Sequence, residues 1–215
     1  MKKALIIGIN YYNDNNNLNG CVNDAISMAD VLSKNQDESK NFDVRLITAE
    51  AKENMLTIDS LKELISELFK DDEEIVLFYF SGHGSIDNSE GCLVTSDCEK
   101  LEMKFIMDNV NQSKAKNKIL IIDSCFSGQL GNYKKDDSIS ILKEGVTILT
   151  ASTKNQYSFE SEGTGVFTNL FVDALNGSAA DLLGNITPGS IYAHIDQSLG
   201  SWQQRPVFKT NVKNF

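Results

Sequence analysis

Four runs of apolar residues without polar alternation constrain this sequence more than any other feature. They cover residues 4–9, 44–47, 75–80 and 119–122, and a shorter fifth run covers residues 146–149. A strand with one face in water alternates apolar and polar residues, whereas a strand buried on both faces is apolar throughout. The runs therefore predict central strands of a sheet that is covered on both sides.

Helical patterns separate these strands. Residues 23–32 and 58–69 repeat apolar side chains at three- and four-residue steps, as helices that pack on a sheet do. Strand, helix and strand in succession predict a parallel sheet. Two further helices over 167–175 and 190–199 and an edge-like strand over 205–210 complete the pattern. We expect an α/β fold with a mostly parallel central sheet of about six strands, flanked by helices on both faces.

The length of 215 residues suits one domain with a buried core, and we expect residues 1–215 to form a single domain. Residues 13–19 are rich in asparagine and are interpreted as a turn-rich loop that is structural filler. Residues 128–143 are the most linker-like segment inside the domain.

Charge and cysteine usage exclude several classes of function. The formal net charge is −10, which argues against nucleic acid and anionic membranes as partners, because both attract basic surfaces. The apolar run at residues 4–9 is too short for a signal peptide, and no stretch approaches the roughly 20 apolar residues of a membrane span. The four cysteines have no CxxC spacing and the two histidines lie far apart, so no zinc pattern is present. A reducing, cytoplasmic location is expected.

Two strand ends carry residues that are suited to nucleophilic chemistry. The third run ends in Phe80-Ser-Gly-His-Gly84, and the fourth leads into Asp123-Ser-Cys125. The carboxyl ends of neighbouring parallel strands lie side by side, so His83 and Cys125 would face each other. A thiol is a nucleophile, an imidazole can take its proton, and the backbone amides of Gly84 and Cys125 could hold an oxyanion. The pattern predicts a Cys/His dyad.

Each of these residues has a structural alternative. A free cysteine is often a small buried apolar residue, and a lone histidine is often structural. The pairing of His83 and Cys125 at two strand ends favours chemistry over that alternative. The other cysteines, Cys21, Cys92 and Cys98, are not predicted to be nucleophiles, and His194 is interpreted as a surface or half-buried helix residue.

These motifs resemble the caspase-like cysteine peptidases, and most closely the metacaspases and their bacterial relatives. The resemblance is carried by residues 80–84, by Ile-Ile-Asp-Ser-Cys-Phe-Ser-Gly over 121–128, and by the opening strand over 4–10. Residues 165–168 and 204–208 also look like the family's C-terminal half, so the resemblance covers nearly the whole chain. One departure is Phe126, where metacaspases usually carry histidine. The resemblance implies a caspase-like fold, His83 as general base, Cys125 as nucleophile, and Gly84 and Cys125 as oxyanion donors.

The resemblance also implies a pocket for the substrate residue before the scissile bond, the S1 site. Metacaspases place a cysteine, a serine and two aspartates there, and the matching positions here are Cys21, Asp24, Ser81 and Asp123. Two converging carboxylates would hold an Arg or Lys side chain and repel an Asp side chain. The structural alternatives are a helix first-turn role for Asp24 and a loop-orienting role for Asp123.

Calcium is not expected as a cofactor. Many metacaspases bind calcium through aspartates that follow the histidine strand, and here that stretch keeps only the scattered acids Asp97, Glu99 and Glu102. Calcium prefers six to eight oxygen ligands, which three scattered acids do not supply.

Self-cleavage is a further hypothesis. The 128–143 segment contains Lys134, Lys135 and Lys143, the residue type that the S1 site would accept. A solvated charged loop is the alternative interpretation of these lysines.

Two rival functions remain beside a cysteine endopeptidase that acts on peptides after Arg or Lys. One is a catalytically silent interaction or regulatory module on the caspase fold, since a fold does not guarantee its chemistry. The other is a thiol hydrolase of small acyl substrates. Retention of His83 and Cys125 argues against the first, and the paired acids Asp24 and Asp123 argue against the second. A monomer is expected.

Overall fold

The computed structural model describes residues 1–88, 90–124, 142–151, 160–161, 164–199 and 206–212. These residues form a six-stranded sheet in the order β11-β8-β7-β3-β1-β2. Its strands are β1 (Lys2–Ile9), β2 (Asp43–Ala49), β3 (Ile75–Ser81), β7 (Asn117–Asp123), β8 (Val146–Thr150) and β11 (Val207–Asn211). All neighbouring strands are parallel except β8 and β11, which are antiparallel. The predicted fold class is confirmed, and so is the edge position of the last strand.

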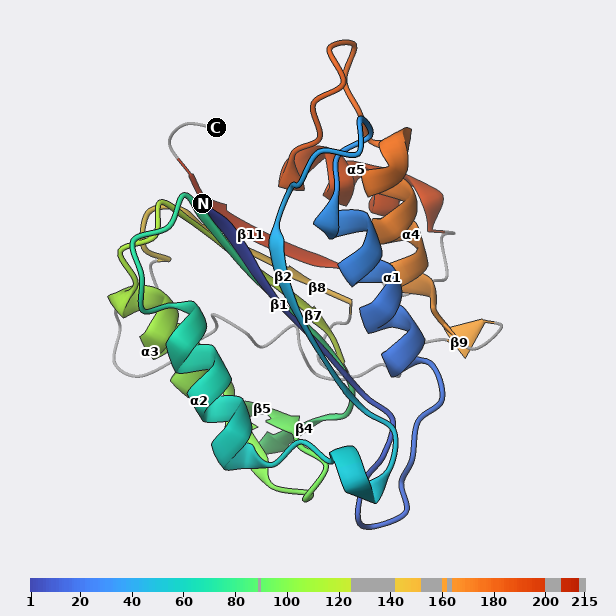
Figure 1. Ribbon diagram of the computed structural model, residues 1–215, viewed down its shortest axis with the longest axis vertical. Coiled ribbons are helices and arrows are strands. Elements are labelled where there is room, and N and C mark those ends of the chain that lie inside the picture. The colour runs from blue at the N-terminus through green and yellow to red at the C-terminus, as the bar shows by residue number, and fades with distance from the viewer. Residues whose placement is uncertain (89, 125–141, 152–159, 162–163, 200–205, 213–215) are drawn as a thin grey trace.

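Helices cover both faces of this sheet (Figure 1). One face carries α1 (Cys21–Ser33), α4 (Val166–Asp173) and α5 (Pro188–Ser198), and the other carries α2 (Ile58–Leu68) and α3 (Met103–Gln112). Alternate residues of each strand point to opposite faces. Ile6 and Tyr79 therefore pack with α1 and α4, whereas Ile7 and Phe78 pack with α2 and α3. Both sets of side chains are fully buried, which explains why the strand sequences show no alternation.

Several elements were not expected from the sequence. A small antiparallel sheet follows β3 and consists of β4 (Gly84–Asp87), β5 (Glu90–Val94) and β6 (Lys100–Glu102). A short hairpin of β9 (Glu160–Ser161) and β10 (Thr164–Gly165) precedes α4, and α3 follows β6. A 3-10 turn (Lys52–Asn54) and a π-helical turn (Ala174–Ser178) lie in connections. Strands β4 and β6 are short and partly exposed, so they produce no apolar run in the sequence.

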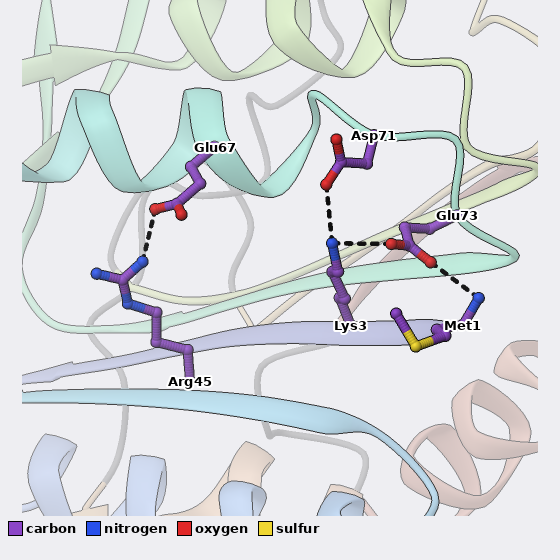
Figure 2. Close-up of polar contacts among 6 residues, drawn as sticks. All are labelled: Met1, Lys3, Arg45, Glu67, Asp71 and Glu73. Carbon is purple, nitrogen blue, oxygen red and sulfur yellow. Dashed lines mark hydrogen bonds and ion pairs between the residues drawn. The ribbon is translucent and has the colours of Figure 1, made fainter.

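The connection between α2 and β3 is fastened to β1 by ion pairs (Figure 2). Lys3 Nζ lies 2.8 Å from Glu73 Oε1 and 2.9 Å from Asp71 Oδ2, and the amino group of Met1 lies 2.8 Å from Glu73 Oε2. The hydrogen bond from Lys3 holds the pKa of Glu73 below its ordinary value, and Glu73 in turn raises the pKa of Lys3. These contacts lie near the amino ends of the strands, away from the edge where parallel sheets carry their sites.

Among the described residues, no helix combines the length and the apolar character that crossing a bilayer requires.

Candidate active site

The carboxyl ends of β3 and β7 lie side by side at the middle of the sheet. Ser81 ends β3 and pairs in register with Asp123, which ends β7. The backbone N–H of Gly82 donates to the carbonyl oxygen of Asp123 at 3.3 Å. His83 thus follows the strand that neighbours the one leading to Cys125, while Cys125 itself lies outside the described residues.

The His83 side chain is oriented by the backbone of a distant loop. Its Nε2 lies 2.7 Å from the carbonyl oxygen of Asn16. A carbonyl oxygen only accepts hydrogen bonds, so Nε2 is the protonated nitrogen of the neutral ring and Nδ1 has the lone pair. The backbone N–H of His83 donates to the Tyr12 hydroxyl at 2.7 Å, and the two rings have centroids 4.5 Å apart. This arrangement makes Nδ1 the nitrogen that can accept a proton.

The asparagine-rich loop is itself held by hydrogen bonds. Asn17 Oδ1 accepts from the Tyr12 N–H at 2.8 Å, and Asp14 Oδ1 accepts from the Asn16 N–H at 3.1 Å. These bonds to Asn16 lower the pKa of Asp14. The interpretation of residues 13–19 as filler is therefore wrong, because this loop supplies the carbonyl that orients His83.

Tyr12 is buried beneath this loop, with 1% of its surface exposed. Burial raises the pKa of its phenol well above the ordinary value, so the hydroxyl stays protonated. An added Cβ on Gly82 would come 2.7 Å from the Tyr12 hydroxyl, which shows how closely the tyrosine approaches the histidine strand. A glycine at position 82 is needed for that approach.

Solvent reaches His83 through an open pocket with a volume of about 350 Å³. Gly84, the predicted oxyanion donor, begins β4 and lines this pocket beside His83. The backbone of His83 is also held by β5, because Val94 donates its N–H to the His83 carbonyl at 2.9 Å. The remaining lining residues are Tyr12, Asp14, Asn16, Asn17 and Val94.

The predicted S1 residue Asp24 is buried on α1, with 3% of its surface exposed. Its Oδ2 accepts from the Ser81 hydroxyl at 3.2 Å, and its Oδ1 accepts from the backbone N–H of Gly165 at 2.9 Å. These contacts bring residues from α1, β3 and the start of α4 together. Cys21, one helical turn before Asp24, is also buried.

Asp123 approaches the same point from β7. Its Oδ2 accepts from the Thr168 hydroxyl at 2.8 Å. A methyl group built on Gly165 would lie 2.9 Å from Oδ2 of Asp123 and 3.0 Å from Oδ2 of Asp24. The two carboxylates therefore converge on one small volume next to Gly165.

Sequence reasoning missed four residues at this site: Tyr12, Asn16, Gly165 and Thr168. A signal existed for two of them, because Gly165 and Thr168 lie in a stretch that already resembles the family. No signal marks Asn16, since it contributes a backbone carbonyl that every residue type carries.

Cys92 on β5 and His194 on α5 were also weighed as candidates. Cys92 is buried, and burial raises the pKa of its thiol, which disfavours a reactive thiolate. His194 lies on α5, half-buried, with Nε2 at 2.9 Å from Asp173 Oδ2, as expected for a helix residue with a structural role.

One of the acids considered for calcium, Asp97, has a structural role. Asp97 Oδ2 accepts from the backbone N–H of Ile58 at the start of α2, and its Oδ1 accepts from the Thr95 hydroxyl. Asp97 thus helps to cap α2. No group of three or more potential metal ligands occurs within the described part of the chain. Independence from calcium stays a prediction.

Of the three lysines considered for self-cleavage, Lys134 and Lys135 lie outside the described residues. Lys143 precedes β8, and its Nζ donates to the carbonyl oxygen of Asn111 at 2.8 Å. Lys118, near the start of β7, pairs with Val146. Lys143 is therefore at the amino edge of the sheet, separated from the carboxyl edge by roughly 15 Å or more at about 3.3 Å per strand residue.

A mostly parallel six-stranded sheet, with a histidine after one central strand and Asp-Ser-Cys at the end of its neighbour, defines a caspase-type α/β protein. Two examples of solved structures with a similar fold follow. Protein GSU0716 from Geobacter sulfurreducens superposes with a TM-score of 0.75 at 18% identity, covering 100% of this chain and 94% of that one. Caspase-1 from Spodoptera frugiperda has a TM-score of 0.71 at 16% identity, covering 98% and 86%.

The model of the caspase domain family matches residues 1–214, and the chain belongs to that family. The resemblance to caspase-like cysteine peptidases is confirmed. Metacaspase-1 of Plasmodium falciparum is 35% identical over 153 residues, which cover 59% of this chain and 24% of that protein. Metacaspase-7 of Arabidopsis thaliana is 28% identical over 187 residues, which cover 81% and 45%. The chain thus spans less than half the length of these relatives.

Proposed function

We propose that this chain is a cysteine endopeptidase that uses His83 and Cys125 to hydrolyse peptide bonds after Arg or Lys. The observation that carries the proposal is the convergence of Asp24 and Asp123 beside the strand end that leads to the histidine. Membership of the caspase domain family supports the reaction type. The basic specificity is supported by the chemistry of the two carboxylates.

The reaction begins with proton transfer from the Cys125 thiol to Nδ1 of His83. The thiolate attacks the carbonyl carbon of the scissile bond, and the backbone amides of Gly84 and Cys125 hold the oxyanion. His83 then protonates the leaving amine, and the acyl group remains on the sulfur. Water, deprotonated by His83, releases the acid product and restores the thiol. The bond from Nε2 to Asn16 keeps the ring in the tautomer that both proton transfers need.

Substrate choice follows from charge. A guanidinium or ammonium group between Asp24 and Asp123 makes charge-assisted hydrogen bonds with both carboxylates. Aspartate at the same position meets two like charges in a buried setting. The proposed enzyme works as a monomer without calcium, and cleavage of a molecule by its own dyad is confined to Lys134 and Lys135.

The test is a charge-neutralising exchange in the S1 site with a control on the same helix. Asp24→Asn keeps the shape of the side chain but removes its charge, and we expect kcat/KM for Arg- and Lys-ended peptides to fall about 10- to 100-fold. Asp30→Asn, at an exposed position of α1, should leave kcat/KM unchanged. Circular dichroism establishes that both variants are folded. Equal activity of Asp24→Asn and wild type would remove Asp24 from the S1 site.

A further inference from the structure

Three buried side chains from three elements form a chain of hydrogen bonds behind the S1 site. The Tyr79 hydroxyl on β3 lies 2.6 Å from the Thr168 hydroxyl on α4, which lies 2.8 Å from Oδ2 of Asp123 on β7. Tyr79 and Thr168 have no exposed surface, and Asp123 is 6% exposed. The contacts are buried, so water does not substitute readily for any of these partners.

The direction of this chain follows from counting hydrogens. A carboxylate oxygen only accepts, so the single hydroxyl hydrogen of Thr168 is used in its bond to Asp123. Thr168 then has only lone pairs to offer Tyr79, and Tyr79 must be the donor. Both hydroxyl hydrogens therefore point along the chain toward Asp123.

The surroundings of Tyr79 keep it a donor. Burial raises the pKa of its phenol well above the ordinary value, and the charges of Asp123 and Asp24 and the Cys21 thiol raise it further. These titratable groups come from α1 and β7, which pack around the tyrosine. Tyr79 consequently remains protonated at neutral pH.

We infer that Tyr79 and Thr168 are positioning residues for substrate specificity. They fix the orientation of the Asp123 carboxylate so that it binds the basic side chain of the substrate. This inference rests on the proposed function, because it concerns the same S1 site. The bond from Thr168 occupies one side of Oδ2 and fixes the carboxylate beside Gly165 and Asp24. Hydrogen bonds to the ionised form also offset the repulsion that Asp24 exerts on it.

The kinetic test uses Tyr79→Phe and Thr168→Val, each of which removes a hydroxyl at nearly constant volume. We expect KM for Arg- and Lys-ended peptides to rise about 3- to 10-fold while kcat changes little, because the nucleophile and the base are untouched. Thr168→Ser restores the hydroxyl and should return KM to near the wild-type value. Thr147→Val is the matched control, since Thr147 is a buried threonine bonded to Thr210 on the edge strand.

A second measurement tests the positioning of Asp123 without relying on catalysis. The carboxyl of Asp123 can be titrated by carbon-13 NMR of aspartate-labelled protein, with the signal assigned by its loss in Asp123→Asn. Removing the direct donor should raise the pKa of Asp123 in Thr168→Val. Tyr79→Phe should raise it less, because Tyr79 donates to Thr168 and not to Asp123, and Thr147→Val should leave it unchanged.

The two measurements separate this inference from the proposed function. Raised KM and a raised Asp123 pKa, with rescue by Thr168→Ser, support the positioning role. Wild-type KM and an unchanged pKa in both variants would overturn it while the peptidase function stands. If wild type cleaves no Arg or Lys peptide, the proposed function fails. The NMR titration still tests whether the hydrogen bonds of Tyr79 and Thr168 stabilise the ionised Asp123 carboxylate.

Discussion

The carbonyl oxygen of Asn16 and Nε2 of His83 are joined by a 2.7 Å hydrogen bond across more than sixty residues of sequence. The bond fixes the tautomer of His83, and the Tyr12 hydroxyl fixes its backbone. Within the loop between β1 and α1, Tyr12 and Asn16 are therefore part of the machinery proposed for proton transfer.

Tyr12→Phe tests this part of the account. It removes the acceptor of the part-buried His83 N–H and loosens the backbone that carries the ring, so we expect kcat to fall about 3- to 10-fold with little change in KM. Tyr11→Phe is the matched control, because the Tyr11 hydroxyl contacts only the exposed loop residue Asn13 among the contacts described. Steady-state kinetics on an Arg-ended peptide measures both. A wild-type kcat in Tyr12→Phe would show that the hydroxyl does not position the histidine.

Gly165→Ala tests the convergence of the two carboxylates. Gly165 has a φ of −72° and a ψ of 134°, which alanine adopts without strain, so the effect of the methyl group is steric. The methyl would lie within 3.0 Å of both Oδ2 atoms. We expect at least a 10-fold loss of kcat/KM on Arg- and Lys-ended peptides with the fold retained.

Gly189→Ala is the control for that exchange, because a methyl there meets only Thr187 at 3.8 Å. It should keep wild-type activity. Full activity of Gly165→Ala would mean that substrates do not occupy the volume between Asp24 and Asp123.

The position of Lys143 makes a prediction about self-cleavage. It lies at the amino edge of the sheet, remote from His83, so a molecule cannot present this lysine to its own dyad while β8 stays paired. Intact mass spectrometry of freshly purified wild type and Cys125→Ala should show fragments ending at Lys134 or Lys135 in the wild type alone. A fragment ending at Lys143 that forms at a rate independent of protein concentration would contradict this placement.

The lowered pKa of Glu73 predicts that part of the fold's stability is lost at acidic pH. Its pKa is below the ordinary value because of Lys3, so its contribution to stability is fully present above the unfolded-state pKa of about 4.3. That contribution is lost as the pH falls through the lower pKa of the folded state. In urea unfolding between pH 7 and pH 3, the free energy of unfolding should therefore decrease less on acidification in Glu73→Gln than in wild type.

Glu74→Gln changes the neighbouring, exposed acid and serves as the control. Its unfolding midpoint should follow the wild-type pH dependence. Identical slopes for wild type and Glu73→Gln below pH 4.3 would show that the bond to Lys3 does not stabilise the folded state.

Strands β1, β3, β7 and β8 were predictable because each is largely buried on both faces and reads as an apolar run. The same expectation for the run at 44–47 is wrong, because β2 is an edge strand of the sheet and most of its residues are exposed or half-buried. The placement of His83 beside the Asp123 strand followed from the same sheet, since parallel strands bring their carboxyl ends together. Helix α3 shows the familiar spacing at Met103, Ile106 and Met107, so its signal lies in the sequence although no helix was predicted there.

The supporting residues were less accessible to sequence reasoning. Asn16 acts through its backbone, and Gly165 acts through an N–H and the absence of a side chain. In the sequence, Tyr79 looks like one more apolar residue of a buried strand. Nothing in the sequence indicates that its hydroxyl contacts Thr168. Each of these roles depends on contacts between elements that are distant in the chain.

The most direct test of the account is the initial rate of hydrolysis of three fluorogenic peptides that differ only in ending with Arg, Lys or Asp. Wild type is compared with Cys125→Ala, with calcium and with chelator. The account predicts cleavage after Arg and Lys but not Asp, equal rates with and without calcium, and no cleavage by Cys125→Ala. Cleavage after Asp, or undiminished cleavage by folded Cys125→Ala, would contradict it.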